Sequence, residues 1–342
     1  MELKEAISRV TRREDLDLDE MRTVMSAIMR GETDPVQMGG FLVGLAMKGE
    51  AVDEITAAVM VMRELMHPVR VDADHVVDIV GTGGDGAGLF NVSTAASFAA
   101  AACGARVAKH GGRGVSSSSG SADLLTRAGV SLELTSEQIA RCIEDIGVGF
   151  MFAPNHHTAM RHAVAVRKAL GVRTMFNILG PLTNPTGATR QVIGVYSPDL
   201  LVPMATVLKR LGSQHVLVVH AEDGLDELSI AADTLVAELH HGEIREYVIT
   251  PEEVGLERQS LESIRADSAE ESLVLVKAAL RGEGVAADMV AYNAGAALYV
   301  ADVASSIHDG VQIVRDALKN GRGLAKLDAL AEFSARLAEA GD

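Results

Sequence analysis

An apolar run ends in a glycine-rich stretch whose residues could bind a phosphate group. Gly81–Gly86 reads G-T-G-G-D-G, and Asn91–Thr94 (N-V-S-T) opens the Ala-rich stretch that follows. Glycines let the backbone approach an anion, inward-turned N–H groups form an anion-binding nest, and a helix N-terminus adds its positive end. A plain tight turn is the alternative, but Asp85 and the N-V-S-T cluster in the same connection favour phosphate binding. A Walker loop or a Rossmann fingerprint fits poorly, because neither the Gly-Lys-Ser/Thr ending nor the later acidic residue is present.

A second segment, rich in cations, glycine and serine, follows the next expected strand. Lys109–Ser121 combines Lys109, Arg113, four glycines and five serines in thirteen residues. A flexible linker would explain the glycines and serines, but not the two cations or the position at the carboxyl end of a strand. Charged donors, hydroxyls and backbone freedom suit a loop that closes over a polyphosphate.

Two adjacent carboxylates are candidates for a metal site. Asp226-Glu227 follows the turn Asp223-Gly224 after an expected strand. Mg²⁺ typically takes one or two carboxylates together with substrate phosphates. Solvated surface is the alternative for these acidic residues. A zinc site among His156, His157 and His162 is not expected, because the spacing of these residues does not match an H-E-x-x-H motif.

The chain divides into a helical unit and an α/β unit near residue 72. Helical periodicity predicts helices at Asp19–Arg30, Val36–Met47 and Asp53–Met66. Strands and helices then alternate, which predicts a largely parallel sheet covered on both faces. The expected strands are His75–Val80, Ala105–Ala108, Val148–Phe152, Gln191–Tyr196 and His215–His220, with a hairpin of Thr234–His240 and Glu243–Ile249. The expected helices are Val92–Cys103, Ala122–Ala128, Ser136–Ile146, Asn155–Leu170, Pro198–Leu211 and a helical tail over Ser268–Asp342.

Composition excludes some classes of protein. The 342 residues carry a formal charge of −16, which argues against nucleic-acid or anionic-membrane partners. The first twenty residues are highly charged, and the longest apolar run, Val92–Gly104, spans 13 residues, too few for a membrane helix. Cys103 and Cys142 show no CxxC spacing and fit buried thiols of a reducing compartment. We therefore expect a cytoplasmic protein.

Six motifs in order resemble those of the anthranilate phosphoribosyltransferase family, over about residues 3 to 335. They are V-D-I-V-G-T-G-G-D-G, N-V-S-T, K-H-G-G-R-G-V-S-S-S-S-G-S-A-D-L-L, F-A-P-N-H-H, F-N-I-L-G-P-L-T-N-P and D-G-L-D-E-L-S. The resemblance implies a small helical domain (1–72, with 166–184 crossing back to it) and a larger α/β domain (73–165 and 185–342). It also implies a homodimer through the helical domain and a cleft between the two domains. There the phosphoribosyl group of 5-phosphoribosyl 1-diphosphate (PRPP) would be transferred to anthranilate with Mg²⁺, two ions per subunit.

The resemblance also implies roles for individual residues. The donor would be bound by Gly81, Gly84, Asp85, Asn91, Val92, Ser93, Thr94, Lys109, His110, Gly111, Gly112, Arg113, Gly114, Val115, Ser116, Ser117 and Ser121. The acceptor would meet Gly81, His110, His157 and Arg167, and the metal Ser93, Asp226 and Glu227. Leu89 lies in the same lobe but has no polar side chain. On one helix, His157 and Arg167 would lie about 80° apart and border one cleft, and the planar guanidinium of Arg167 matches a carboxylate.

Two positions depart from the family pattern, which reads K-H-G-N-R-x-V-S-x-K-S-G. Gly112 stands where the family has Asn, and Ser118 stands where it has Lys. We expect weaker acceptor binding with the chemistry retained.

The mechanism implied is displacement of diphosphate at the anomeric carbon through positioning and charge stabilisation, with no residue acting as general acid or base. The alternatives are a phosphoribosyltransferase or nucleoside phosphorylase of the same fold with another acceptor, a non-catalytic nucleic-acid-binding relative, and a nucleotide sensor.

Overall fold

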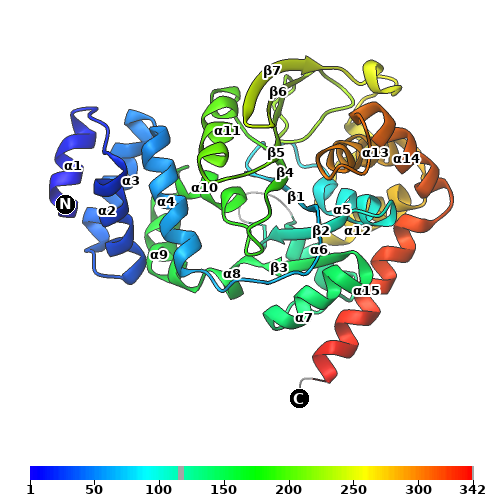
Figure 1. Cartoon of the computed structure of the whole chain (residues 1–342), viewed down its shortest axis with the longest axis horizontal. Helices are drawn as coiled ribbons and strands as arrows, with labels where there is room; N and C mark the ends of the chain where they lie inside the picture. Colours follow the sequence, from blue (N-terminus) through cyan, green and yellow to red (C-terminus); the bar gives the residue numbers. More distant parts are fainter. Residues whose placement is uncertain (115–118, 341–342) are drawn as a thin grey trace.

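A computed structural model describes residues 1–114 and 119–340 of the chain. A cluster of helices lies at one end of the molecule and a sheet covered by helices forms the rest (Figure 1). The predicted fold class is confirmed: a small helical domain precedes a larger α/β domain with a mostly parallel central sheet.

Four helices begin the chain: α1 (Leu3–Thr11), α2 (Leu18–Arg30), α3 (Pro35–Lys48) and α4 (Val52–Leu65). Local sequence sets their ends. Asp17 and Glu20 form a capping box at the start of α2, and Asp34 caps α3 directly before Pro35. Farther along the chain, α9 (Arg161–Leu170) packs against α2 and α3, and α10 (Phe176–Leu179) packs against α4. In Figure 1 these two helices, in green, lie beside α4.

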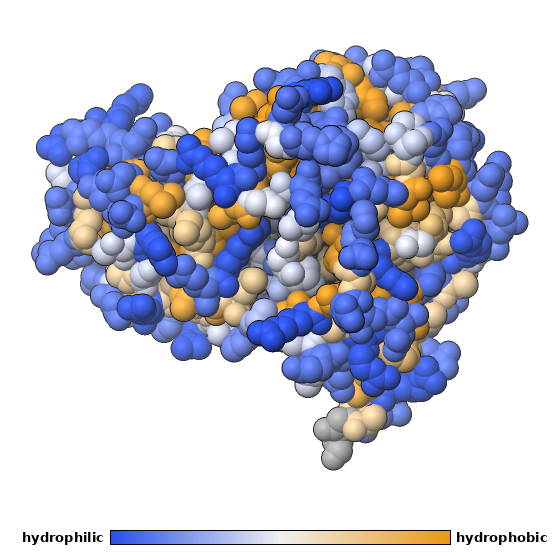
Figure 2. Space-filling model, viewed as in Figure 1, coloured by the Kyte–Doolittle hydropathy of each residue, from blue (hydrophilic) through white to orange (hydrophobic). Residues whose placement is uncertain are grey.

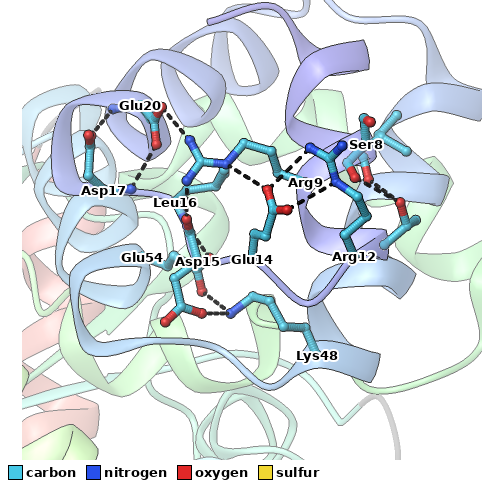
Figure 3. Close-up of polar contacts among 12 residues, drawn as sticks. Ser8, Arg9, Arg12, Glu14, Asp15, Leu16, Asp17, Glu20, Lys48 and Glu54 are labelled. Atoms are coloured by element: carbon cyan, nitrogen blue, oxygen red, sulfur yellow. Dashed lines mark hydrogen bonds and ion pairs between the residues drawn. The ribbon is translucent and has the colours of Figure 1, made fainter.

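A buried ion pair joins the helices of this unit. The carboxylate of Glu54 is fully buried on α4 and accepts hydrogen bonds from Leu16 N (3.0 Å), Ala51 N (2.7 Å) and Lys48 Nζ (2.9 Å). Lys48 Nζ also donates to Asp15 at 2.6 Å (Figure 3). Because each buried charge has several partners, the cost of removing it from water is offset. The network therefore fixes the loop between α1 and α2 and the loop between α3 and α4.

The sheet has seven strands in the order β3-β2-β1-β4-β5-β6-β7. The strands β3, β2, β1, β4 and β5 run parallel, while β6 and β7 continue the sheet as an antiparallel hairpin. The carboxyl ends of β1, β2 and β4 therefore meet at one edge, the position at which open α/β sheets bind ligands. The strands are β1 (Val76–Gly81), β2 (Arg106–Gly111), β3 (Val148–Phe152), β4 (Arg190–Gly194), β5 (His215–Ala221), β6 (Thr234–His240) and β7 (Glu243–Ile249).

Two hydrophobic clusters cover opposite faces of the sheet. Leu217 and Val219 of β5 belong to the cluster that contains α5 and the C-terminal helices, while Val216 and Val218 belong to the cluster that contains α1 to α4. This alternation follows from the two-residue period of a strand. The remaining helices are α5 (Val92–Ala102), α6 (Ser121–Arg127), α7 (Ser136–Arg141), α8 (Ala153–His156), α11 (Leu201–Arg210), α12 (Ala269–Leu280), α13 (Gly284–Val300), α14 (Ile307–Lys319) and α15 (Arg322–Glu339).

Two of the differences from the sequence-based predictions bear on the candidate site. The single helix predicted over Asn155–Leu170 was wrong: α8 ends at His156, and α9 starts at Arg161 after a short 3-10 turn. His157 between them has φ −111° and ψ 57°, outside the helical region. The strand predicted over Ala105–Ala108 instead runs to Gly111, so that Lys109 lies in β2 and not in a loop.

In the described part of the chain, no helix combines the length and the apolar character that crossing a membrane would require. The face of the molecule seen in Figure 2 is largely hydrophilic, with hydrophobic side chains in scattered patches.

Candidate active site

The glycine-rich turn after β1 packs directly against the loop that carries Asp226. A Cβ atom at Gly81 would overlap Asp226 Oδ2, and one at Gly194, the last residue of β4, would overlap the Asp226 carbonyl oxygen. Gly83 N donates to Asp226 Oδ2 at 2.6 Å. The glycines therefore place a carboxylate against the cradle, an approach that any side chain would block.

Three acidic groups converge here. The carboxyl groups of Asp85 and Asp226 interact directly, and Glu227 accepts a hydrogen bond from the backbone N–H of Ser93. Burial, followed by the charge of Asp85, raises the pKa of Asp226 to about 6, and burial followed by the charge of Asp226 raises the pKa of Glu227 well above its usual value. Carboxylates grouped in this way are hard oxygen donors that a divalent cation would stabilise. The residues present therefore fit Mg²⁺.

Lys109 is the cation of this site. It is buried on β2, and its Nζ donates to the Ile79 carbonyl oxygen (2.6 Å) and to Ser93 Oγ (3.3 Å). Burial lowers the pKa of Lys109, although the nearby carboxylates of Asp78, Glu227 and Asp226 oppose this effect. An ammonium group between the acidic cluster and the start of α5 can neutralise an anion bound at the same edge of the sheet.

The first turn of α5 brings the polar residues of N-V-S-T to the cradle. Asn91 precedes the helix, and its Oδ1 accepts hydrogen bonds from Ser272 Oγ (2.7 Å) and Ser119 Oγ (3.1 Å). Thr94 Oγ1 donates to Ser121 Oγ at 2.9 Å, while Val92 is buried in the core. The start of α5 therefore lies beside the second loop, where its helix N-terminus can contribute to an anion site.

The second loop is held at both ends by one carboxylate. Asp123 accepts hydrogen bonds from Gly114 N (2.9 Å), Gly120 N (3.0 Å) and Arg113 Nη1 (2.9 Å). Arg113 is thus paired with Asp123 at the surface. At the start of the loop, a Cβ on Gly111 would press on Ser121 and Phe150. Of the predicted loop residues, Val115, Ser116, Ser117 and the departing position Ser118 lie outside the described residues.

Two histidines predicted to meet the acceptor lie together. The rings of His110 and His157 meet edge to face with centroids 5.1 Å apart, and the Nε2 atom of each is buried with no hydrogen-bond partner among the described residues. Burial lowers the pKa of His157 to about 4 and that of His110 well below its usual value, so both rings are neutral near pH 7. A buried polar atom without a partner is costly. Each of these two buried nitrogens therefore retains an unused hydrogen-bonding site.

Arg167 does not share a continuous helix with His157, so the angular argument that placed both at one cleft does not hold. Arg167 lies on α9, and its guanidinium stands over the ring of Phe176, 5.4 Å from the ring centre. Burial lowers the pKa of Arg167, although this group keeps its charge at any physiological pH. At Gly112, no described residue lies within 4 Å of an added Cβ.

Two residues near the site were missed by sequence reasoning. Asp78, fully buried in β1, accepts hydrogen bonds from Asn184 Nδ2 (2.7 Å) and His110 N (3.3 Å), and burial raises its pKa to about 6. A carboxylate inside the apolar run H-V-V-D-I-V was a visible signal for it. Arg173 donates a hydrogen bond to the Gly84 carbonyl oxygen. No local pattern marks this arginine, because its partner is distant in sequence.

His215, Glu238 and His240 form another group with metal-ligand chemistry in the described part of the chain. The two imidazole rings are stacked, with centroids 3.9 Å apart and planes within 7°. Because an imidazole lone pair lies in the plane of its ring, rings stacked in this way cannot both point at one ion. Glu238 instead accepts hydrogen bonds from His215 Nε2 (2.9 Å) and from the Tyr299 hydroxyl group (2.8 Å). This group is a hydrogen-bonded network.

Comparison with known proteins gives consistent matches over almost the whole chain. Residues 4–66 match the helical bundle domain of a glycosyl transferase family, and residues 73–324 match its a/b domain. The chain is 62% identical over 338 residues to anthranilate phosphoribosyltransferase of Chromohalobacter salexigens, covering 99% of this chain and 98% of that protein. It is 56% identical to that of Cellvibrio japonicus, covering 98% and 99% of the two chains.

Solved structures agree with these matches. The crystal structure of anthranilate phosphoribosyltransferase from Thermus thermophilus superposes with a TM-score of 0.91 at 47% identity, over 96% of this chain and 99% of that one. The enzyme from Saccharomyces cerevisiae in complex with PRPP and Mg has a TM-score of 0.88 at 24% identity, over 98% of each chain, and shows the same fold.

Proposed function

The chain belongs to the anthranilate phosphoribosyltransferase family, and on that premise we propose that it transfers the phosphoribosyl group of PRPP to the amine of anthranilate. The products are N-(5-phosphoribosyl)anthranilate and diphosphate, formed in tryptophan biosynthesis. One observation carries the proposal: the glycine cradle, Lys109 and the Asp226-Glu227 carboxylates converge at the carboxyl edge of the parallel strands.

The cradle is proposed to bind the diphosphate of the donor. Gly81, Gly84 and Asp85 supply backbone that can approach an anion, and the first turn of α5 adds helix N–H groups. The yeast relative described above holds PRPP and Mg. The full donor set proposed is Gly81, Gly84, Asp85, Asn91, Val92, Ser93, Thr94, Lys109, His110, Gly111, Gly112, Arg113, Gly114 and Ser121, with Val115, Ser116 and Ser117 beyond the described residues.

Mg²⁺ is the proposed cation, with two ions per subunit and Ser93, Asp226 and Glu227 as ligands. The raised pKa values of Asp226 and Glu227 support this, because like charges that repel each other are stabilised by a cation. Bound Mg²⁺ would add positive charge beside the leaving diphosphate.

In the proposed mechanism, the C–O bond from the anomeric carbon to diphosphate breaks as the C–N bond to anthranilate forms. Lys109 neutralises charge that develops on the leaving diphosphate, and the backbone N–H groups of the cradle hold its oxygens in place. The aromatic amine is neutral at pH 7, so the reaction needs no strong general base. The chain contributes mainly orientation and charge stabilisation.

Acceptor binding is assigned to Gly81, His110, His157 and Arg167. The neutral rings of His110 and His157 offer polar Nε2 atoms together with flat apolar faces, which suit an aromatic amine. Arg167 would bind the carboxylate of anthranilate. Gly112 adds no side chain, so a side-chain amide that other members of the family place here is absent.

The proposal extends to the whole chain. Residues 1–72 together with 166–184 form the small domain, and residues 73–165 and 185–342 form the PRPP-binding domain. The packing of α9 and α10 against the first four helices supports this division. We also infer a homodimer through the helical domain. A cytoplasmic location is supported by the two free thiols, Cys103 and Cys142.

Fluorescence provides a direct test. Purified protein is mixed with PRPP, MgCl₂ and anthranilate, and loss of anthranilate fluorescence is followed with and without excess EDTA. We expect turnover that EDTA abolishes and Mg²⁺ restores. PRPP binding without turnover of anthranilate would favour a different acceptor or a sensor. Phosphorolysis of a nucleoside in place of this reaction would favour a nucleoside phosphorylase.

A further inference from the structure

Arg173 connects the helical part of the molecule to the glycine cradle. It lies between α9 and α10, and its Nη2 donates a hydrogen bond to the carbonyl oxygen of Gly84. Its guanidinium also stands over the ring of Tyr196, with Cζ 4.3 Å from the ring centre. A planar cation that both stacks and donates is held in one orientation.

Gly84 is shaped for this contact. Its φ of +83° lies in the left-handed region that favours glycine, and an added Cβ would stand 3.2 Å from Arg173 Nη2. The Gly84–Asp85 peptide is trans, so its C=O and N–H groups point in opposite directions. Because Arg173 holds the oxygen of Gly84, the N–H of Asp85 is directed away from the guanidinium.

The cradle is therefore oriented from two sides. On one side, Asp226 Oδ2 accepts the N–H of Gly83 at 2.6 Å. On the other side, Arg173 holds the carbonyl group of the next residue, Gly84. Tyr196 reinforces this second side, because its backbone N donates to Thr82 Oγ1 at 3.1 Å while its ring packs on Arg173.

The backbone that carries Arg173 is itself fixed. Thr174 N donates to Asn177 Oδ1 at 3.0 Å directly after the arginine. On either side, α9 and α10 pack against helices of the N-terminal unit. Arg173 therefore links the segment between α9 and α10 to Gly84 through one side chain.

We propose that Arg173 is a positioning residue for the donor: it sets the orientation of the Gly84–Asp85 peptide in the diphosphate cradle and links that orientation to the helical domain. This inference rests on the proposed function, because it requires the cradle to bind diphosphate. Arg173 acts here through the backbone of Gly84 and is not a catalytic residue.

The test compares Arg173→Ala and Arg173→Lys with the wild-type protein. Binding of PRPP and of inorganic diphosphate, each with Mg²⁺, is measured by calorimetry, and kcat and both KM values are measured by fluorescence. We expect both variants to bind each donor ligand about tenfold more weakly, a loss of about 1.4 kcal/mol, with KM for anthranilate within about twofold of wild type. Lysine should not rescue, because it keeps the charge but lacks the planar fork. Arg245→Ala, on the exposed strand β7, is the matched control and should bind as wild type does.

A double-mutant cycle adds a second measurement. Gly84→Ala alone should also weaken diphosphate binding, and its effect should be less than additive with Arg173→Ala if both act on one peptide. Full affinity in Arg173→Lys would show that charge alone is needed and would overturn the inference, as would unchanged affinity in Arg173→Ala or strictly additive effects. If the wild-type protein itself fails to bind PRPP with Mg²⁺, the proposed function fails instead.

Discussion

At the scale of single residues, the most informative position is Gly112. No described residue lies within 4 Å of a Cβ added at Gly112, so the described neighbours leave room for the base of a side chain there. The family pattern has Asn at this position, where its amide would add hydrogen-bonding groups beside the acceptor.

Gly112→Asn should therefore lower KM for anthranilate, by roughly threefold to tenfold for one added hydrogen bond, and leave KM for PRPP and kcat close to wild type. Steady-state kinetics with each substrate varied in turn measures this. Gly112→Ala is the control, because it adds a Cβ without an amide and should leave KM for anthranilate unchanged. Equal kinetics for the Asn variant and the wild type would show that the contact has no importance in this chain.

The neutral histidines give a pH prediction. Burial lowers the pKa of His157 to about 4, whereas the unfolded chain has an ordinary value near 6.5. Between these values the unfolded state binds a proton that the folded state does not, so this residue makes stability fall as the pH drops from about 6.5 to 4. His157→Asn removes this contribution. When the pH falls from 7 to 4.5, the free energy of unfolding should decrease by about 2 kcal/mol less for the variant than for the wild type.

Urea unfolding at a series of pH values measures this difference in slope. The comparison is made within each protein, because Asp78 and Asp226, whose raised pKa values act in the opposite direction, remain in both. If the free energy of unfolding depended on pH in the same way in both proteins, His157 would not be a buried neutral residue.

At the scale of elements, the close approach of β4 to the Asp226 loop places the carboxylates of the site. A Cβ at Gly194 would overlap the Asp226 carbonyl carbon and oxygen, neither of which can move as a flexible side chain would. Gly194→Ala should therefore destabilise the protein by at least about 2 kcal/mol and weaken the Mg²⁺ dependence of activity. Thermal unfolding and a Mg²⁺ titration of activity measure the two effects.

Gly180→Ala is the matched control for stability. Gly180 has a right-handed helical conformation (φ −52°, ψ −55°), and an added Cβ meets no described residue within 4 Å. The unfolding temperature of this variant should stay the same or rise slightly. A Gly194→Ala variant as stable as the Gly180→Ala variant would mean that the Asp226 loop can move away without cost.

The sequence predicted the parallel strands and the glycine cradle because their signals are local: an apolar run, a glycine turn and a helix start follow one another. The break between α8 and α9 could not be predicted in this way. Both segments favour helix, and the kink at His157 depends on distant contacts: His67 N donates to the His156 carbonyl oxygen at 2.8 Å, and the His156 ring bonds the His67 carbonyl oxygen at 2.9 Å. Tertiary contacts of this kind override local propensity.

The same reasoning applies to the candidate site. Asp226-Glu227 could be proposed from two adjacent carboxylates after a strand, but the contact of Asp226 with Gly81 and Gly194 depends on strand order, which no motif states. Arg173 was missed because it meets Gly84 across 89 positions of sequence. Lys109 was found, yet its place in the buried part of β2 was not, because glycines and serines directly after it resemble a loop.

At the scale of the whole molecule, the proposed homodimer makes a specific demand on the surface of the helical domain. Val36 and Met47 are 83% and 74% exposed at the two ends of α3. Eleven residues separate them, which places them about 20° apart around the helix axis, on one face. Val164 and Val172, also exposed, lie in and just after α9, which packs against α3. An exposed apolar face of this kind suits a second copy of the chain.

The double variant Val36→Glu/Met47→Glu should therefore be monomeric, because charges on both copies would be buried against each other in a two-fold interface. Sedimentation equilibrium should give twice the 36.0 kDa chain mass for the wild type and a single chain mass for the variant. Val248→Glu, at a half-exposed position on β7, is the control and should remain dimeric. A double variant that stays dimeric would place the interface elsewhere, whereas a monomeric wild type would remove the dimer from the proposal. Because the active-site residues assigned above all come from one chain, the monomeric variant should retain turnover. A monomeric variant without turnover would mean that the partner copy shapes the active site.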